Sequence, residues 1–361
     1  MRRQTRNFLL GKVGIGSDYP VTVQSMCNTR TADIEQSLAQ IDRLVRAGCD
    51  IIRLSADSPA DAAALKSICA ASPIPVIADI QFSGASAIGA IESGCAGIRV
   101  NPGIIQDQQL LERIARAAAA NGTVIRVGAN AGSLKLHRLE TLLSSGMEKN
   151  DALAELLCEA VLDQCARLEK YGVKKIKAAV KSSDIAVTLK ACRKFASRSD
   201  LPLHLGLTEA GTPEKGILRS AAAIGSLLVD GIGDTIRVSL TAEPEKEVAA
   251  AKKILDACGL SGNAVEVISC PTCGRTEIDL IGLAQKVEDL IGKLQAAGKL
   301  IRWHKIAVMG CPVNGPGEAR NADIGIAGSR NGQVVIFRKG EVIGAYPESE
   351  GFELFAGMLQ K

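Results

Sequence analysis

The feature that most constrains the fold is an eightfold alternation between short aliphatic runs and longer amphipathic runs over residues 20–260. The amphipathic runs repeat their apolar residues at helical spacing, and many end at the glycine favoured at a helix C-terminus. The aliphatic runs are too apolar for a half-exposed sheet, so they predict parallel strands covered on both faces. Eight such units predict a closed (β/α)8 TIM-type barrel, with an open doubly wound sheet as the alternative. The predicted strands cover residues 21–26, 50–56, 75–80, 96–102, 123–130, 174–180, 201–208 and 235–241.

The last hundred residues follow a different pattern. A short strand at residues 265–269 precedes a helix with regular apolar spacing at 277–298, and further strands and a terminal helix follow. This pattern predicts a small α+β domain. We therefore expect a barrel over residues 1–260 that binds the substrate, and a second domain over residues 261–361.

Length and charge exclude several classes of protein. With 361 residues the chain is too long for one ordinary core, and its net charge of +4 comes without a long basic run, which argues against nucleic-acid binding. No charge-free apolar segment is long enough to cross a membrane. The 11 cysteines are odd in number and spread through the chain, so we expect reduced thiols and a cytoplasmic location.

Four of the predicted strands place an arginine between aliphatic neighbours: Arg53, Arg99, Arg126 and Arg237. A fifth strand carries Lys177 in the same setting. A buried charge without a partner costs several kcal/mol, so each cation needs a counter-charge or a route to water. Any one arginine could pair locally or extend to solvent. Because a barrel gathers its strand ends at one mouth, the four together predict a cationic site for phosphate.

Other polar groups accompany these arginines. By the two-residue alternation of a strand, three of them share faces with the arginines: Asn101, Asn130 and Ser239. Asp79 ends the third predicted strand and Glu209 follows the seventh. A carboxylate is not needed to bind an anion, so these two are candidates for hydroxyl recognition or proton transfer, or for orienting the arginines.

The second domain carries the residues typical of a metal site. Cys270 and Cys273 form a C-x2-C turn that suits zinc, a single iron or part of an iron–sulfur cluster equally well. Cys311 is the third cysteine of this domain, and His304 could complete a structural zinc site. Three cysteines can alternatively hold three irons of a cubane and leave the fourth iron for chemistry.

Glu318 ends a glycine- and proline-rich segment that begins beside Cys311. Gly310, Gly315 and Gly317 predict a rigid, sharply turning loop that could return Glu318 toward the metal. An oxygen ligand is more exchangeable than a thiolate, so a substrate oxygen could displace it. We therefore interpret Glu318 as a metal ligand that also takes part in catalysis.

With these motifs the sequence resembles the 4-hydroxy-3-methylbut-2-enyl diphosphate synthase family, iron–sulfur enzymes of the methylerythritol phosphate route to isoprenoids. The resemblance runs almost end to end through VQSMCNTRTAD, IRVNPG, VIRVGANAGSL, LHLGLTEAG, GIGDTIRVSL, CPTCGR and VMGCPVNGPGEA. It implies reductive opening of 2-C-methyl-D-erythritol 2,4-cyclodiphosphate, with loss of water and two electrons from ferredoxin or flavodoxin. It also implies a homodimer in which the cluster domain of one chain closes over the barrel of the other.

The resemblance also assigns residues. It implies that a [4Fe-4S] cluster is held by Cys270, Cys273, Cys311 and Glu318, and that Glu209 protonates the leaving hydroxyl. It further implies a set of diphosphate-binding positions: Arg53, Arg99, Arg126 and Asn130. Two positions depart from the family pattern, because Gln81 stands where histidine is common and Arg219 where lysine is common.

Two other functions remain open from the residues. A non-redox phosphosugar lyase or aldolase with a zinc-stapled second domain would give a colourless protein. A non-enzymatic cluster carrier would have no use for the arginines.

Overall fold

The computed structural model describes residues 2–80, 84–102, 107–130, 136–262 and 265–360. The chain forms two compact units, Met1–Leu260 and Ser261–Lys361, which are described separately below. None of the helices in these ranges combines the length and the apolar character needed to span a membrane.

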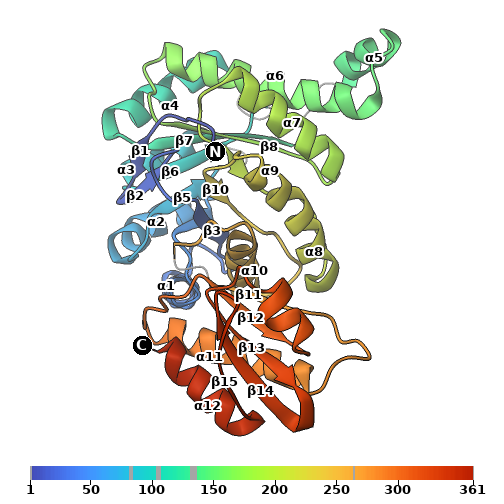
Figure 1. The fold of residues 1–361 in the computed structure, drawn as a ribbon. Helices are drawn as coiled ribbons and strands as arrows, with labels where there is room; N and C mark the ends of the chain where they lie inside the picture. Colours follow the sequence, from blue (N-terminus) through green and yellow to red (C-terminus); the bar gives the residue numbers. More distant parts are fainter. Residues whose placement is uncertain (1, 81–83, 103–106, 131–135, 263–264, 361) are drawn as a thin grey trace. The chain divides into compact units, whose positions relative to one another are not determined.

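The first unit contains eight parallel strands in the order β8-β7-β6-β5-β4-β3-β10-β9 (Figure 1). A parallel bridge between Ala178 and Leu203 joins the two outermost strands, so the sheet curls into a nearly closed barrel. The predicted barrel is confirmed, and the open doubly wound alternative is wrong. The strands are β3 (Thr22–Met26), β4 (Ile51–Ser55), β5 (Val76–Asp79), β6 (Gly97–Val100), β7 (Val124–Asn130), β8 (Ile176–Lys181), β9 (His204–Leu205) and β10 (Thr235–Ile236).

Helices follow the strands, and local caps set where several of them begin. Asp33 accepts a hydrogen bond from the Gln36 N–H at the start of the first helix, and Ser58 and Asp61 form a capping box at the second. The sequence pattern after β7 gives two helices rather than one. The helical elements of this unit are α1 (Ile34–Arg46), α2 (Pro59–Ala71), α3 (Gly84–Glu92), α4 (Gln108–Asn121), α5 (Leu136–Ser144), α6 (Lys149–Lys170), α7 (Ile185–Arg198), α8 (Pro213–Ser220), η2 (Ala221–Gly225), α9 (Ser226–Val229) and α10 (Pro244–Ala257).

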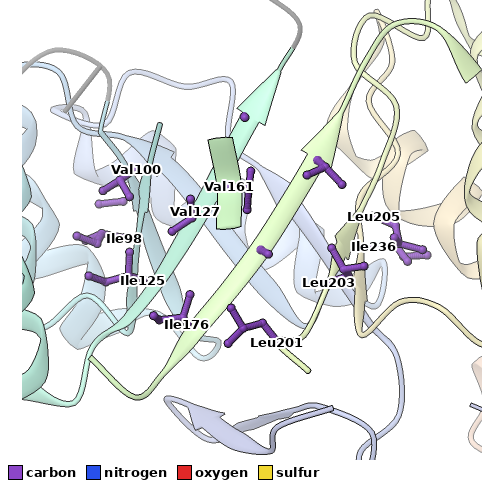
Figure 2. Close-up of a cluster of buried hydrophobic side chains, with 14 of the residues drawn as sticks. Ile98, Val100, Ile125, Val127, Val161, Ile176, Leu201, Leu203, Leu205 and Ile236 are labelled. Carbon is purple, nitrogen blue, oxygen red and sulfur yellow. The ribbon is translucent and has the colours of Figure 1, made fainter. Parts of the chain in front are cut away.

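The largest hydrophobic core lies between strands and helices. Ile125 and Val127 of β7 belong to it together with Val161 of α6 (Figure 2). Since successive strand residues point to opposite faces, this packing directs Arg126 to the other face of β7, toward the barrel interior. The outward apolar residues of the strands therefore fix the inward position of the charged ones.

An N-terminal hairpin closes a smaller apolar cluster against the barrel. Strands β1 (Phe8–Leu10) and β2 (Val13–Ile15) pair antiparallel, and Leu10 and Ile15 pack with residues near the beginnings of the barrel strands. Those residues are Ile51, Ile77 and Val124. The N-terminal end of this part of the barrel is therefore filled with aliphatic side chains, which leaves the opposite end for chemistry.

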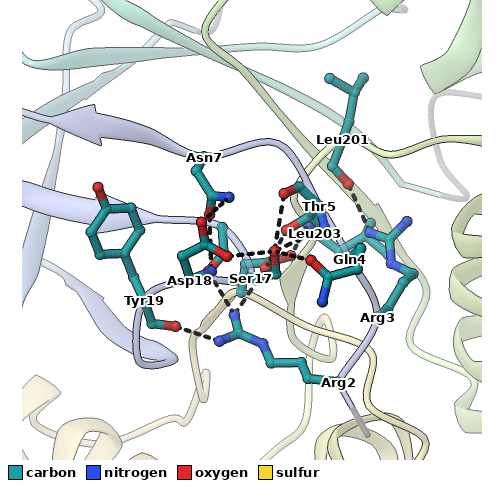
Figure 3. Close-up of polar contacts among 12 residues, drawn as sticks. Arg2, Arg3, Gln4, Thr5, Asn7, Ser17, Asp18, Tyr19, Leu201 and Leu203 are labelled. Atoms are coloured by element: carbon teal, nitrogen blue, oxygen red, sulfur yellow. Dashed lines mark hydrogen bonds and ion pairs between the residues drawn. The ribbon is translucent and has the colours of Figure 1, made fainter.

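Polar contacts hold the N-terminal residues in place. Figure 3 shows the Arg3 guanidinium donating to the Leu201 carbonyl, at 2.8 Å, and the Thr5 N–H donating to Ser17 Oγ, at 3.2 Å. Asp234, just before β10, accepts from Arg2 at 2.9 Å. These contacts join the start of the chain to the segments that lead into β9 and β10.

The second unit is a five-stranded mixed sheet in the order β11-β12-β13-β14-β15. β11, β12 and β13 are parallel, and β14 pairs antiparallel with both β13 and β15. Lys339 and Gly340 adopt the positive φ values of a tight hairpin turn between β14 and β15. Phe355, Val287 and Ile306 lie in its main core. The elements are β11 (Glu266–Ser269), α11 (Leu280–Ala296), β12 (Lys305–Met309), η3 (Val313–Glu318), β13 (Ile324–Ser329), η4 (Arg330–Gly332), β14 (Gln333–Arg338), β15 (Glu341–Pro347) and α12 (Glu348–Leu359).

Candidate functional site

A cavity of about 200 Å³ opens at the carboxyl ends of the barrel strands. Five cationic side chains line it, and Asp79 is the one carboxylate among the described lining residues. We call these five the cationic cup: Arg53, Arg99, Arg126, Lys181 and Arg237. The structure thus brings the four arginines predicted from the strands to one place.

Asp79 holds two of the arginines. Its carboxylate lies 3.5 Å from Arg53 Nε and 3.3 Å from Arg99 Nη1, because β5 lies between β4 and β6. Burial alone would raise the pKa of Asp79, but Arg53, Arg99 and Arg126 outweigh it and lower that pKa. Asp79 is therefore ionised, and its position supports the orienting role considered for it.

Arg237 is paired with a carboxylate from the helix that follows it. Glu247 of α10 is buried, and its Oε2 lies 3.2 Å from Arg237 Nη2. Glu247 Oε1 also accepts from the Leu240 N–H at 2.9 Å, which fixes the carboxylate in place. The Met26 sulfur accepts from Arg53 at 2.9 Å, so a soft acceptor completes this side of the cup. The sequence analysis found neither Glu247 nor Met26.

Arg126 and Lys181 have no ion-paired carboxylate among the described residues, and burial, followed by the neighbouring arginines, holds the pKa of Lys181 well below its ordinary value. Within the described part of the chain, Arg126 Nε and Nη1 are buried without a hydrogen-bond partner. Burial, and then the neighbouring arginines Arg53 and Arg99, hold the pKa of Arg126 well below its ordinary value. Burial also lowers the pKa of Arg53, to about 10, although Asp79 opposes this shift. The cup is thus a region of excess positive charge, open to an anion.

The sequence analysis also missed Lys181. Lys177 was the lysine singled out in that strand, and Lys181 lies four residues farther along β8. By the two-residue alternation the two share a face, so the same signal could have placed Lys181 at the mouth. Lys177 is fully buried and does not line the cavity in the described residues.

The polar residues predicted to share strand faces with the arginines differ in where they lie. Ser239 lines the cavity. Asn101 is buried just after β6 but is not among the described lining residues. Asn130 ends β7 opposite Lys181, and its side chain lies outside what the structure describes. Gln81 also lies outside the described residues.

Glu209 and Arg219 line a second hollow, of about 560 Å³, rather than the cup. Its other lining residues come from the segment after β8, where the Ser183 carbonyl accepts a hydrogen bond from Arg219. Thr208 lines the cup and Glu209 is the next residue, so the two hollows meet at this turn. Glu209 has φ of 54°, an unusual value for a residue with a side chain. Such backbone strain is found at functional sites, and it fixes the direction in which the Glu209 side chain leaves the backbone.

Cys270 and Cys311 follow neighbouring parallel strands of the second unit. β11 and β12 pair with Ser269 opposite Val308, so both cysteines come just after the same edge of the sheet. The Gly310 N–H donates to Cys270 Sγ at 3.2 Å, which brings the first cysteine against the segment that carries the third. Hydrogen bonds of this kind stabilise metal-bound thiolate sulfur.

Cys273 follows Cys270 by three residues and is exposed. The Arg275 N–H lowers the pKa of the Cys273 thiol, and the Arg275 guanidinium contributes in the same direction. A thiolate is the form that binds iron or zinc. Among the described residues, no three His, Cys, Asp or Glu side chains are gathered as a preformed metal site.

The segment that carries Glu318, predicted to be a rigid, sharply turning loop, is helical instead. Residues Val313–Glu318 form the π-helical turn η3, with the Gly315 N–H bonded to the Cys311 carbonyl at 3.2 Å. A Cβ on Gly315 would lie 2.6 Å from the Ala327 Cβ, so glycine here permits close packing on β13. Tertiary packing thus overrides the local preference of glycine and proline for loops. The Glu318 side chain lies outside what the structure describes.

His304 lies at the opposite end of β12 from Cys311. It precedes Lys305, the first residue of that strand, whereas Cys311 follows the last, Met309. A strand of five residues spans about 16 Å, which is several times a metal–ligand distance. The zinc site formed by His304 and the cysteines is therefore excluded by the strand geometry.

Comparison with known proteins accounts for both units. Residues 5–252 match the GcpE TIM-barrel domain, and residues 266–361 match the GcpE protein C-terminal domain. The chain belongs to the GcpE family. A GcpE relative from Persephonella marina, named 4-hydroxy-3-methylbut-2-en-1-yl diphosphate synthase (flavodoxin), is 46% identical, covering 97% of this chain and 95% of the relative. The protein of that name from Corynebacterium diphtheriae is 45% identical, covering 97% and 86%.

Membership of the GcpE family confirms the predicted family and the predicted class of enzyme, an oxidoreductase of isoprenoid biosynthesis. A solved dihydropteroate synthase from Xanthomonas albilineans has a TM-score of 0.50 at 15% identity, covering 70% of this chain and 96% of that chain. This likeness concerns the fold alone.

Proposed function

We propose that the chain converts 2-C-methyl-D-erythritol 2,4-cyclodiphosphate to 4-hydroxy-3-methylbut-2-enyl diphosphate, with two electrons from flavodoxin and loss of water. The observation that carries this proposal is the cationic cup, in a chain of the GcpE family. Five cations around one carboxylate suit the two phosphoryl groups of such a substrate. The flavodoxin donor follows from the names of the relatives.

A [4Fe-4S] cluster fits the donor set of the second unit. Cys270, Cys273 and Cys311 would hold three irons and Glu318 the fourth, and the Gly310 N–H already donates to one of the sulfurs. When bound, the cluster supplies single electrons and an iron with an exchangeable position. Glu318 would hold that iron through a carboxylate oxygen, a more exchangeable ligand than a cysteine thiolate.

The barrel residues have separate parts in the proposed reaction. The arginines of the cup bind the diphosphate, and Asp79 orients Arg53 and Arg99 through the contacts given above. Glu209, held in a fixed direction by its backbone, would donate the proton that the leaving hydroxyl needs. Two chains would form a homodimer in which the cluster domain of one chain acts on the substrate in the barrel of the other. We propose that this dimer works in the cytoplasm.

Anaerobic purification tests the cluster and the reaction together. We expect a brown protein with four irons and four sulfides per chain that turns over with reduced flavodoxin. Cys311→Ser should lose the cluster and the activity, whereas Arg126→Ala should keep the cluster and lose diphosphate binding. A colourless, iron-free protein from cells with active cluster assembly would refute the proposal, and sedimentation would test the dimer.

A further inference from the structure

Lys177 is a buried amine for which the proposed reaction has no role. It lies on β8 opposite Arg126 of β7 and is completely inaccessible to solvent. In the described residues its Nζ has no hydrogen-bond partner. A buried ammonium without an acceptor is among the costliest groups in a protein, so its presence in the interior requires an explanation.

The charged groups around Lys177 are mostly cations. Arg126 of β7 and Arg53 of β4 act on Lys177, and Lys181 of its own strand lies in the same interior. The carboxylates are Asp79 of β5, Asp234 before β10 and Glu247 of α10.

Each of these carboxylates is already engaged elsewhere. Asp79 pairs with two arginines of the cup, and Glu247 pairs with Arg237. Asp234 accepts from Arg2, Thr5 and the Leu203 N–H, at 2.9, 3.0 and 2.8 Å. Among the described residues, Lys177 is therefore left without a counter-ion.

Burial lowers the pKa of Lys177 to about 7, and Arg126 lowers it further while Asp234 opposes the shift. His204 also lies buried in this interior, and its Nδ1 is 2.7 Å from Thr235 Oγ1. Burial and the nearby cations hold the pKa of His204 well below its ordinary value, so His204 is neutral. Negative charge bound at Arg126 would favour the protonated form of an amine on the neighbouring strand.

We infer that Lys177 is a positioning residue that takes up a proton when a diphosphate group binds in the cationic cup. Above neutral pH the amine is largely uncharged while the cup is empty, and its lone pair accepts one proton from solvent as the anion arrives. No electron is transferred and no other bond changes. The added charge, on the strand beside Arg126, helps to balance the diphosphate. This inference rests on the proposed function, because it places the diphosphate in this cup.

Calorimetric titration of the full-length, anaerobically purified chain with inorganic diphosphate tests the inference. Repeating the titration in buffers of different ionisation enthalpy gives the number of protons taken up per diphosphate. Lys177→Met gives an unbranched side chain that is one atom shorter and cannot titrate. The difference in proton uptake between the native chain and this variant cancels the protonation of the diphosphate itself. With a pKa of about 7 in the empty cup, the difference should be about half a proton at pH 7 and nearly one at pH 8.

His204→Asn is the matched control, because it removes a second titratable group that is fully buried in this interior. It should take up as many protons as the native chain. Equal uptake by the native chain and Lys177→Met at pH 8, with both binding diphosphate, would overturn the inference. So would an uptake lost in His204→Asn and retained in Lys177→Met.

If Lys177→Met does not fold, the native chain and His204→Asn still decide the matter. Their uptake at pH 8, after subtraction of the protons bound by free diphosphate, should reach at least about one, because Lys181, whose pKa burial also lowers, can add to it, and should fall toward pH 6. A proton uptake near zero after this subtraction refutes the inference. Failure of the proposed function would look different, because the native chain would then not bind diphosphate at all.

Discussion

Replacing Lys177 with methionine should stabilise the barrel in a pH-dependent way. The pKa of this lysine falls from 10.5 in a model peptide to about 7 in the folded chain. The unfolded chain therefore binds more protons between these values, and native stability rises with pH across that window. A shift of this size lowers the free energy of unfolding by about 5 kcal/mol when it acts in full. Most of this destabilisation is present at pH 7, and about 2 kcal/mol of it remains at pH 9. Lys177→Met should remove this cost, so its stability advantage should shrink by about 2 kcal/mol from pH 7 to pH 9.

Denaturation by urea, followed by two signals, can measure this advantage. Far-ultraviolet circular dichroism reports mainly the barrel, which holds most of the helices. The single tryptophan, Trp303, lies in the core of the second unit and reports that unit alone. Its transition should not move in the variant, which makes it an internal control. An advantage that does not change between pH 7 and pH 9, or a variant less stable than the native chain, would refute a desolvated amine at this position.

Three further substitutions test other parts of the account. Asp79→Asn leaves two arginines unpaired and should destabilise the barrel by about 3–5 kcal/mol in the same assay. Inorganic diphosphate should restore part of this stability, and unchanged stability would contradict the pairing role of Asp79. Gly315→Val makes the new side chain clash with Ala327, so the free energy of unfolding followed by Trp303 should fall by about 1–3 kcal/mol. The iron content should fall as well, while the barrel should still bind diphosphate. Glu209→Asn suits the left-handed backbone, so stability should stay within about 1 kcal/mol while turnover falls at least about 10²-fold; full turnover would show that Glu209 is not the proton donor.

The barrel and the arginines of the cup could be predicted because both follow from short-range patterns. A guanidinium between two aliphatic residues of a covered strand must face the interior, and strands of a parallel barrel end at one mouth. Arg53, Arg99, Arg126 and Arg237 obey this rule, and the structure gathers all four.

The partners of these arginines could not be predicted in the same way. Glu247 stands among charged residues at the start of α10 and resembles any exposed helical carboxylate, yet it is buried against Arg237. Its role depends on which way the helix turns over the barrel mouth, and this is a long-range property. The helical turn at Val313–Glu318 was mispredicted for a related reason, because the contact of Gly315 with β13 decides its conformation.

The arrangement of charge explains why the empty barrel tolerates the cup. Asp79 and Glu247 neutralise the arginines on one side, where each carboxylate contacts more than one donor. Arg126 and Lys181, on β7 and β8, have no such carboxylate among the described residues, and Lys177 lies buried on the strand beside Arg126. Adding a fixed carboxylate there would stabilise the folded chain but would also compete with the diphosphate. The uncompensated charge is therefore the part of the cup where ligand binding yields the most free energy, because only there does an incoming anion replace repulsion between cations with attraction.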